Sequence, residues 1–224
     1  MPKRPAPFVP YIYAQEQLRR LLEATDSYQR CLGSIEPLTM RTIVLLLYGA
    51  GLRVGEAINL DRADIDHHNA VLTVRRTKFF KSRLVPFGPQ LGSVLTEYGQ
   101  RPQLLRCAGA DQPAFFTTRS GARLRQGVLQ ASFRRLREYA GIRRPGGARY
   151  QPRLHDLRHT FAVHRLTAWY RQGADVQRLL HHLSVYLGHA HLAATQVYLT
   201  MTPELLHEAG ARFERYALGE DSHA

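Results

Sequence analysis

The sequence predicts a mostly α-helical protein with a small antiparallel β-sheet, an α+β fold class. Apolar residues recur at helical spacing over most of the chain, and only two short stretches, 70–75 and 84–87, are β-prone. The chain has 224 residues, of which 44% are hydrophobic and 22% are charged. This length and composition are typical of one globular domain with a sizeable core.

The first 13 residues are predicted to form an extended arm, because their four prolines, at positions 2, 5, 7 and 10, fix φ and remove backbone donors. The main domain is expected over 14–203, followed by a final helix and tail over 204–224. A Gly/Pro-rich stretch, 143–152, predicts a loop. Helices are expected at 15–23, 39–48, 54–60, 89–99, 126–140, 156–171, 174–183, 191–200 and 204–217.

The two β-prone stretches flank a polar segment that carries Lys78 and Lys81. The first stretch alternates β-forming residues with small or polar ones, and the second is a short run, Leu84 to Phe87. Together they predict a β-hairpin with a basic tip.

The chain is strongly basic. Lys and Arg number 31 against 18 Asp and Glu, which gives a net charge of +13, and the basic residues are spread from Arg19 to Arg215. This balance favours a polyanionic partner, because it raises affinity for phosphate backbones. Charge alone does not separate an enzyme from a passive binder, and the plainer alternative is a role in solubility.

Cysteine usage and hydropathy indicate a cytoplasmic protein. Cys31 and Cys107 form no Cys-x-x-Cys unit, which argues against a zinc ribbon or a disulfide scaffold and favours a reducing compartment. The longest apolar stretches, such as 43–48, are too short to span a bilayer, and the N-terminus lacks the apolar segment of a secretory signal. No membrane partner is expected.

Three separated segments suggest chemistry. They are Gly-Leu-Arg-Val-Gly-Glu at 51–56, Leu-His-Asp-Leu-Arg-His-Thr at 154–160, and Leu-Gly-His at 187–189 followed by Tyr198. On a helix His155 and Arg158 would share a face, and two such groups side by side suit an oxyanion. Arg53 follows a break after a buried-looking helix, a position from which a guanidinium can point into a cleft.

Each residue also has a plain structural explanation. Arg53 could form a structural ion pair with Glu56, three residues further along the chain. A histidine such as His155 is more often a hydrogen-bonded structural residue than a functional one. A tyrosine on an amphipathic helix, such as Tyr198, normally buries its ring in the core.

In combination and in this order, the segments resemble the tyrosine recombinase, or phage integrase, family. Its pattern is G-L-R-x-x-E, a hairpin lysine, H-x-L-R-H, then L-G-H and a tyrosine nine residues on. The resemblance covers about Tyr11 to Tyr216 and implies the tyrosine recombinase catalytic-domain fold, with 14–203 as the catalytic domain. The matching residues are Arg53, Lys78, His155, Arg158, His189 and Tyr198.

The lysine has two candidates. Lys78 and Lys81 both lie in Thr-Lys-Phe-Phe-Lys-Ser-Arg-Leu-Val-Pro at 77–86, which looks like the family's hairpin. The first lysine usually holds the catalytic place there, so Lys78 is preferred and Lys81 is the reserve. Either could be a solvated turn lysine, and for Lys81 a DNA-backbone contact is the favoured alternative.

The spacing of His189 and Tyr198 permits a physical check. On one uninterrupted helix their nine-residue separation is about 900°, so the two side chains would face opposite sides. A shared site therefore needs a break. Gly188 is predicted to end a helix, leaving His189 in a turn and Tyr198 in the next helix.

The resemblance implies a site-specific recombinase or integrase that cuts and rejoins DNA of a mobile element, without cofactor or metal. By family analogy Tyr198 attacks the phosphorus to give a 3′-phosphotyrosine. Arg53 and Arg158 would clamp the phosphate, and His155 would accept the tyrosine proton.

The remaining roles follow the same analogy. Lys78 would protonate the leaving 5′-oxygen, His189 would donate a hydrogen bond to the phosphate, and Glu56 would support the site without touching substrate.

The resemblance also implies partners. These are double-stranded DNA, a tetrameric synapse and association with the nucleoid. Family members usually carry an amino-terminal helical domain that closes around DNA, whereas only the proline-rich arm is expected before the catalytic region here. Three explanations stay open: the chain is a piece of a longer protein, another polypeptide or accessory protein supplies that part, or the enzyme is minimal.

For the final helix, two expectations stay open. It could dock on a neighbouring protomer during synapsis or pack on its own domain. Its apolar stripe consists of Leu205, Leu206, Ala209, Phe213 and Tyr216.

Three rival functions are weighed. A type IB topoisomerase shares the fold and the tyrosine chemistry, but the L-G-H to tyrosine signature favours a recombinase. A zinc hydrolase could use His155 and His159, at i and i+4, but Asp156 replaces the usual glutamate base. For the zinc hydrolase, possible additional ligands are His181, His182, His189 and His191. The last rival is an inactive DNA-binding domain.

Overall fold

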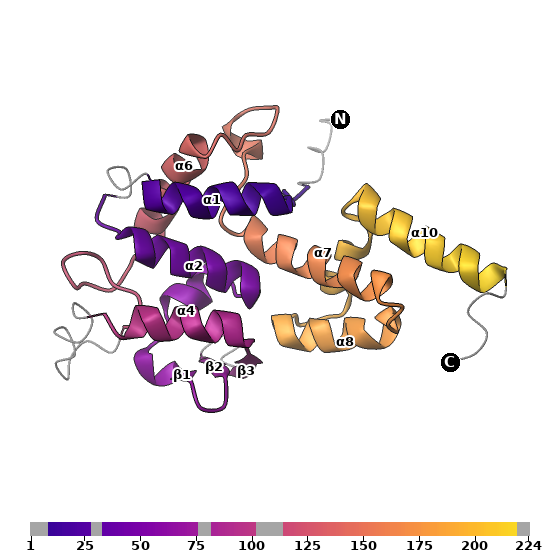
Figure 1. Ribbon diagram of the computed structural model, residues 1–224, viewed down its shortest axis with the longest axis horizontal. Helices are drawn as coiled ribbons and strands as arrows, with labels where there is room; N and C mark the ends of the chain where they lie inside the picture. Colours follow the sequence, from indigo (N-terminus) through magenta and orange to yellow (C-terminus); the bar gives the residue numbers. More distant parts are fainter. Residues whose placement is uncertain (1–8, 28–32, 76–81, 102–113, 219–224) are drawn as a thin grey trace, which may run out of the picture.

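A computed structural model of the chain describes residues 9–27, 33–75, 82–101 and 114–218. Figure 1 shows a mostly helical molecule with one small sheet, which confirms the predicted fold class. The helices are α1 (Gln15–Ser27), α2 (Pro37–Gly49), α3 (Val54–Ile58), α4 (Pro89–Gly99), α6 (Gln126–Tyr139), α7 (Asp156–Arg171), α8 (Val176–Leu187), α9 (Ala193–Gln196) and α10 (Pro203–Ala217). Short 3₁₀ turns are η2 (Arg62–Asp64), η3 (Ala148–Tyr150) and η4 (Val197–Thr200).

Helix α2 organises the first half of the molecule. Pro37 occupies the start of the helix, where its missing N–H costs nothing. Residues 42–47 are apolar after Thr42 and almost entirely buried, so this helix is stable only with neighbours on most sides. Those neighbours are α1, α4 and α7, and Figure 1 shows α1, α2 and α4 stacked beside one another.

The sheet has three antiparallel strands in the order β1 (Ile65–Asp66), β2 (Val71–Val74) and β3 (Arg83–Pro86). Val74 pairs with Arg83 and Val71 with Pro86, which confirms the two strands of the predicted hairpin. Its predicted basic tip, with Lys78 and Lys81, lies outside the described residues. The sequence did not predict β1, because two residues are too few to show strand alternation.

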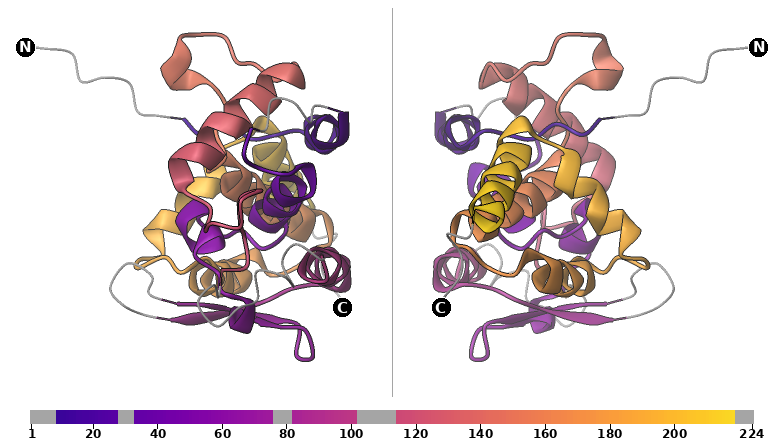
Figure 2. Two further views of the ribbon diagram at one scale, coloured as in Figure 1. Left: turned by 90° about the vertical axis from the view of Figure 1, so that its left-hand side faces the viewer. Right: turned by 90° about the vertical axis from the view of Figure 1, so that its right-hand side faces the viewer.

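Helix α7 carries the second half of the molecule. It contacts α2, α8 and α10, and Figure 1 shows α8 below it and α10 beyond it. In the left view of Figure 2, α6 lies on the side of the molecule opposite α1, α2 and α4.

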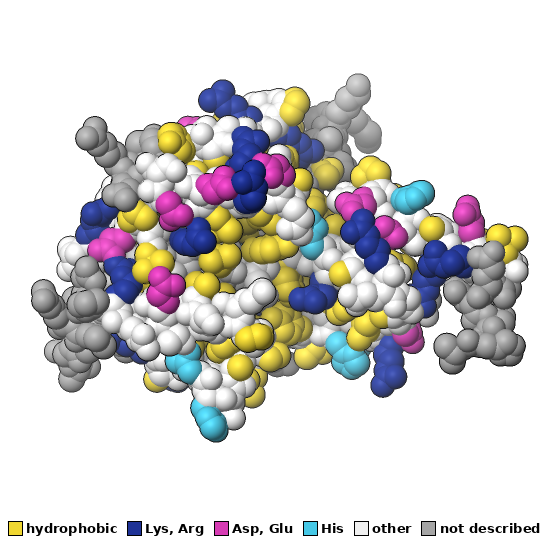
Figure 3. All heavy atoms as spheres, viewed as in Figure 1, with side chains coloured by type: hydrophobic (Ala, Val, Ile, Leu, Met, Phe, Trp, Pro, Cys, Tyr) yellow, Lys and Arg dark blue, Asp and Glu magenta, His cyan; other side chains and the backbone are white. Residues whose placement is uncertain are grey.

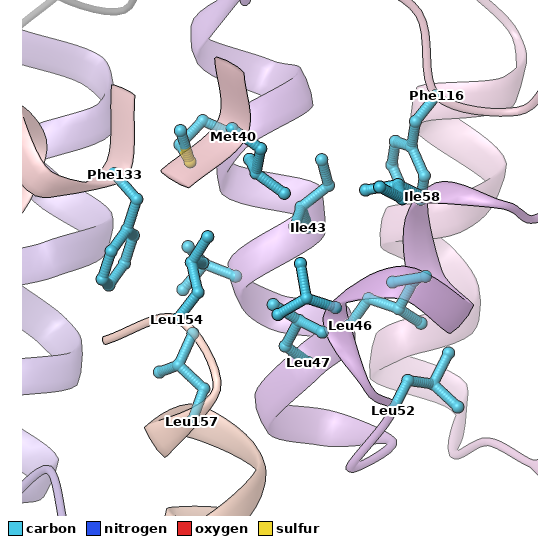
Figure 4. Close-up of a cluster of buried hydrophobic side chains, with 14 of the residues drawn as sticks. Met40, Ile43, Leu46, Leu47, Leu52, Ile58, Phe116, Phe133, Leu154 and Leu157 are labelled. Atoms are coloured by element: carbon cyan, nitrogen blue, oxygen red, sulfur yellow. The ribbon is translucent and has the colours of Figure 1, made fainter. Parts of the chain in front are cut away.

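Two buried clusters form the core. The larger one joins α1, α2, α4, α6 and the sheet, and Figure 4 shows Met40, Ile43 and Leu47 of α2 facing Phe133 and Leu154. The smaller one joins α7, α8, η4 and α10. Partly buried tyrosines, Tyr48 and Tyr186, pack against both clusters and so connect the two halves.

The residues just before α1 are extended, and Tyr13 among them belongs to the core. It is fully buried, its N–H donates to Thr160 Oγ1 at 3.0 Å, and its hydroxyl donates to the Arg153 carbonyl oxygen at 3.2 Å. The last residues of the proline-rich stretch are thus anchored on α7.

Several helices differ from their predicted bounds; α1, for example, runs to Ser27, four residues beyond its predicted end. The helix expected at 174–183 is α8, which begins after Asp175, whose side chain accepts the N–H of Arg178, and runs four residues further. The helix expected at 191–200 consists of α9 and the 3₁₀ turn η4. Packing of Thr195 and Tyr198 into the core sets these short turns, and such tertiary constraints leave no periodicity in a sequence.

The N-terminal end of helix α10 packs on its own domain, and docking on a neighbouring protomer stays a prediction. Leu205 is fully buried in the smaller cluster, and Arg171 of α7 pairs with Glu204 and Glu208. Further along, Phe213 is 70% exposed. The helix is therefore anchored on its own domain at its N-terminal end and exposes apolar residues beyond it.

Acidic and basic side chains are interspersed on the face that carries α1, α2, α4 and α10 (Figure 3). Pairs such as Arg19 with Glu16 account for this mixture. That face offers no uniform positive surface to a polyanion. Within the described parts of the chain, no helix combines the length and apolarity needed to cross a membrane.

Replacing Gly51 by Ala is expected to lower the free energy of unfolding by about 2 kcal/mol or more. Gly51 has φ of 60°, and an added Cβ would lie 2.6 Å from a ring carbon of Phe161. Gly210→Ala in α10 is the matched control, because nothing lies within 4 Å there, and it is expected to stabilise the fold by up to about 1 kcal/mol. Urea denaturation of both variants checks this, and equal effects would contradict it.

Candidate active site

Arg53 stands at the N-cap of α3, directly after the Gly51 turn that ends α2. Its Nη1 donates to Glu56 Oε1 at 2.7 Å, and its backbone N–H donates to Glu56 Oε2 at 2.9 Å. Its Nη2 donates to the Gly188 carbonyl oxygen at 2.9 Å. The ion pair considered from the sequence is therefore present, yet the Arg53 side chain is still 34% exposed and reaches solvent.

Arg158 lies on the first turn of α7. Only 2% of its side chain is exposed. Its Nη1 donates to the Gly51 carbonyl oxygen at 2.7 Å and its Nη2 to the Leu187 carbonyl oxygen at 2.6 Å. Burial lowers the pKa of Arg158 to about 10, so the guanidinium remains charged at neutral pH.

The start of α7 is fixed by Asp156. Its buried carboxylate accepts the backbone N–H of Arg153 at 2.8 Å and a guanidinium hydrogen bond from the same residue at 3.2 Å. This turn holds His155 at the N-cap of the helix, one turn before His159. The rings of the two histidines are in edge contact, 4.8 Å apart between centroids.

Gly188 ends α8 in the left-handed conformation, with φ of 67°, which confirms the predicted break. His189 follows in the turn, where its Nδ1 lies 2.7 Å from Thr195 Oγ1. The chain then reverses through α9 and reaches Tyr198 in η4. The His189 and Tyr198 rings lie 6.0 Å apart between centroids, so the break does bring the two side chains together.

Tyr198 is buried, and its hydroxyl lies 3.1 Å from His159 Nδ1. Burial raises the pKa of Tyr198, while the charge of Arg158, a hydrogen bond with it and the charge of Arg53 act in the opposite direction. The two arginines therefore lie close enough to Tyr198 to favour its ionised form. Five of the six predicted residues lie together: Arg53, His155, Arg158, His189 and Tyr198.

The histidines of the site are neutral at neutral pH. Burial, followed by the nearby arginine charges, lowers the pKa of His155 and of His189 to about 4. The pKa of His159 is lowered to about 3 by burial and then by His155 and Arg158. An anion bound among them would offset the arginine field and raise these pKa values, so each ring can act as a hydrogen-bond partner whose basicity depends on the ligand.

Sequence reasoning missed two residues of this region. His159, which holds the Tyr198 hydroxyl, had been weighed only as a zinc ligand; its signal was its i+4 relation to His155. Arg83 forms a bidentate pair with Glu56, at 2.9 Å and 2.8 Å, and had no sequence signal beyond its place after the basic hairpin segment. Burial raises the pKa of Glu56, but the arginine contacts outweigh it and lower it to about 2.

A groove of about 1010 Å³ opens beside these residues. Arg53 and His155 line one end of it, and α6 lines a side with Gln126, Gln130 and Arg134. All three α6 side chains are exposed. The groove lies on the side of the molecule away from the mixed-charge face of Figure 3, as the position of α6 in Figure 2 indicates.

The two lysine candidates, Lys78 and Lys81, lie outside the described residues. Among the residues that the structure describes, no group of three or more His, Cys, Asp or Glu side chains could hold a metal ion. The zinc interpretation of His155 and His159 therefore lacks a third ligand there.

The chain is similar to known recombinases along its length. It is 44% identical over 219 residues to a protein of Sinorhizobium fredii named as an integrase/recombinase, covering 96% of this chain and 69% of that one. It is 34% identical to the tyrosine recombinase XerA of Pyrococcus furiosus, covering 91% and 62% of the two chains. It thus spans about two thirds of the length of these relatives.

A solved structure and a family profile agree with these relatives. The crystal structure of a XerA recombinase superposes with a TM-score of 0.69 at 27% identity, covering 95% of this chain and 66% of the other. The profile of the phage integrase family matches residues 12–204, which include every element of the site described above. The chain belongs to the phage integrase family of tyrosine recombinases.

Proposed function

We propose that this chain is the catalytic part of a DNA recombinase or integrase that cleaves and rejoins DNA strands through a 3′-phosphotyrosine. The observation that carries the proposal is the buried Tyr198, whose hydroxyl lies 3.1 Å from His159 Nδ1 and whose ring lies beside that of His189. The charges of Arg158 and Arg53 act to lower its pKa. This arrangement offers a nucleophile and an anion site at one place.

Arg53 and Arg158 clamp the scissile phosphate. In-line attack builds negative charge on the non-bridging oxygens, and preorganised cationic donors stabilise it. Neither arginine needs to be reoriented for this task, because main-chain carbonyls already hold both of them. His189 donates a further hydrogen bond to the phosphate.

Tyr198 attacks the phosphorus, and the 5′-oxygen of the cleaved strand leaves. A phenol is a poor nucleophile at neutral pH, so its proton must be removed as the bond forms. His155 is the proposed acceptor. His159 supports this step, since its Nδ1 holds the hydroxyl and its ring contacts that of His155. Lys78 protonates the leaving oxygen, with Lys81 as the alternative.

Double-stranded DNA is the proposed substrate, bound along the arginine-lined groove that starts at Arg53. A XerH recombinase bound to its palindromic difH substrate has the same fold, with a TM-score of 0.65 at 23% identity. The net charge of +13 supports this partner. A chain that acts on chromosomal or mobile-element DNA is expected in the cytoplasm, at the nucleoid.

Residues 204–224 are proposed to contact a neighbouring protomer in a tetrameric synapse, through the exposed part of α10. A lambda integrase tetramer bound to a Holliday junction shares the fold, with a TM-score of 0.62 at 17% identity. The exposed Leu206 and Phe213 support such a contact. They are seven residues apart and so share one face of the helix, and an exposed apolar face is suited to burial by a partner. The amino-terminal helical domain expected of the family would lie before residue 14 in a longer chain or come from another polypeptide.

Tyr198→Phe is expected to abolish the covalent protein–DNA adduct on nicked suicide substrates and to leave DNA binding within a few-fold of the original. The ring remains in the core and only the nucleophilic oxygen is lost. Tyr170→Phe, a partly buried tyrosine on α7, is the control and should still form the adduct. Mapping of the adduct to any residue other than Tyr198 would refute the assignment.

Arg158→Lys is expected to slow adduct formation by about 100-fold or more, because one ammonium cannot reproduce the two-pronged guanidinium. Arg171→Lys on the same helix is the control. Within the described residues the ion pairs of Arg171 are with Glu204 and Glu208, so this substitution should change the rate little. Single-turnover cleavage at saturating DNA measures both. A rate for Arg158→Lys within a few-fold of the original would contradict the clamp.

Phe213→Ser is expected to reduce two-site recombination at least about 10-fold while leaving the adduct on a single site unchanged. The side chain is 70% exposed in the monomer, so the loss would arise in assembly. Val185→Ser, 64% exposed on α8, is the control. Native gel analysis of multi-protomer complexes on DNA gives the second readout, and an equal effect of the two substitutions would argue against this role of α10.

A further inference from the structure

Arg83 of β3 donates three hydrogen bonds within the protein. Its Nη1 and Nη2 donate to the two carboxylate oxygens of Glu56 at 2.9 Å and 2.8 Å. Its Nε donates to the Tyr186 carbonyl oxygen at 3.0 Å. Its guanidinium also lies against Gly188, where an added Cβ would be 3.0 Å from Nη1. With 13% of its side chain exposed, Arg83 faces the inside of the site and is poorly placed to contact DNA itself.

Glu56 is the carboxylate around which the three arginines of the site lie. Arg53 and Arg83 each donate to it, and Arg158 Nη1 stands 3.9 Å from Oε2, within ion-pair range but beyond hydrogen-bond length. Each oxygen already accepts two hydrogen bonds, one of them from Arg83. A carboxylate oxygen has about two acceptor sites, so Glu56 has none left for Arg158.

Without Arg83, each oxygen of this nearly buried carboxylate would lose one partner. A buried, under-satisfied carboxylate attracts any nearby donor strongly. A shift of about 1 Å would bring Arg158 from 3.9 Å to hydrogen-bond length. Such a shift would move the guanidinium off the Leu187 and Gly51 carbonyls and toward Glu56, and so away from the phosphate.

We propose that Arg83 is a positioning residue for strand transfer: it saturates Glu56 so that Arg158 and Arg53 stay directed at the phosphate. The inference rests on the proposed function and adds to it a residue that does not touch DNA. Its plain alternative is a structural tie between β3 and the end of α8, through the Tyr186 carbonyl. The two differ in whether the effect of Arg83 passes through the charge of Glu56.

A double-mutant cycle separates them. Single-turnover adduct formation on suicide DNA is measured for the original chain, Arg83→Gln, Glu56→Gln and the double variant, each at saturating DNA, with the DNA dissociation constant measured in parallel. Arg83→Gln is expected to slow the rate about 100-fold with DNA affinity within a few-fold. In the Glu56→Gln background the same substitution is expected to cost less than about 5-fold, because the competing charge is gone.

Arg101→Gln is the matched control. Arg101 is also 13% exposed and pairs with a glutamate, Glu36, at the far end of α4. It should lower the thermal unfolding midpoint in the same way as Arg83→Gln and leave the rate within about 3-fold. Arg83→Lys keeps the positive charge without the planar guanidinium, and it replaces Arg83→Gln in the cycle if that variant does not fold. It is expected to slow adduct formation about 10-fold.

Two results would overturn the inference alone. One is a rate loss from Arg83→Gln that is equal with glutamate and with glutamine at position 56, which would indicate a structural tie. The other is an unchanged rate in Arg83→Gln. Failure of the original chain to form any adduct would instead overturn the proposed function, and this inference with it.

Discussion

The geometry of the site depends on the last turn of α8, whose final carbonyls hold three arginines. Tyr186, Leu187 and Gly188 accept hydrogen bonds from Arg83, Arg158 and Arg53 respectively. These carbonyls have no partners within the helix and carry its partial negative charge, so cations are favoured there. Because a carbonyl is a dipole and not an anion, it orients a guanidinium without neutralising it. Three arginines and one glutamate leave 3 − 1 = +2 charges at the site.

Concentrating that charge has a cost, which the rest of the site offsets. Arg158 is almost fully buried beside two other arginines, and an unpaired buried cation would be strongly destabilising. The Gly51 and Leu187 carbonyls accept hydrogen bonds from it, and the Glu56 carboxylate lies within ion-pair range. The three histidines of the site add no positive charge at neutral pH, because their pKa values lie near 3 to 4. The positive electrostatic field of the site therefore exists before any ligand binds, and a bound phosphate would reduce the repulsion between the arginines.

Much of this could be anticipated from the sequence, and the exceptions have a common cause. The break at Gly188 followed from helical phase once His189 and Tyr198 were taken to share a site, and the helices of the core followed from periodicity. Arg83 could not be identified, since its partners Glu56 and Tyr186 lie 27 and 103 residues away and a strand arginine in a basic segment is unremarkable by itself. His159 was recognised as paired with His155, but its contact with Tyr198 spans 39 residues. Local patterns report local structure, and these roles arise from long-range contacts.

The two glycines that open and close the motifs explain why such distant segments can meet. Gly51 adopts φ of 60° and brings its backbone against the Phe161 ring, where a Cβ would be 2.6 Å away, while its carbonyl receives Arg158. Gly188 adopts φ of 67° and lets Arg83 lie against its backbone, while its carbonyl receives Arg53. Each glycine thus provides a turn, a close approach and an acceptor at one position. A side chain at either place would separate the arginines from the end of α8, so the glycines set the spacing of the proposed phosphate clamp as directly as the charged residues do.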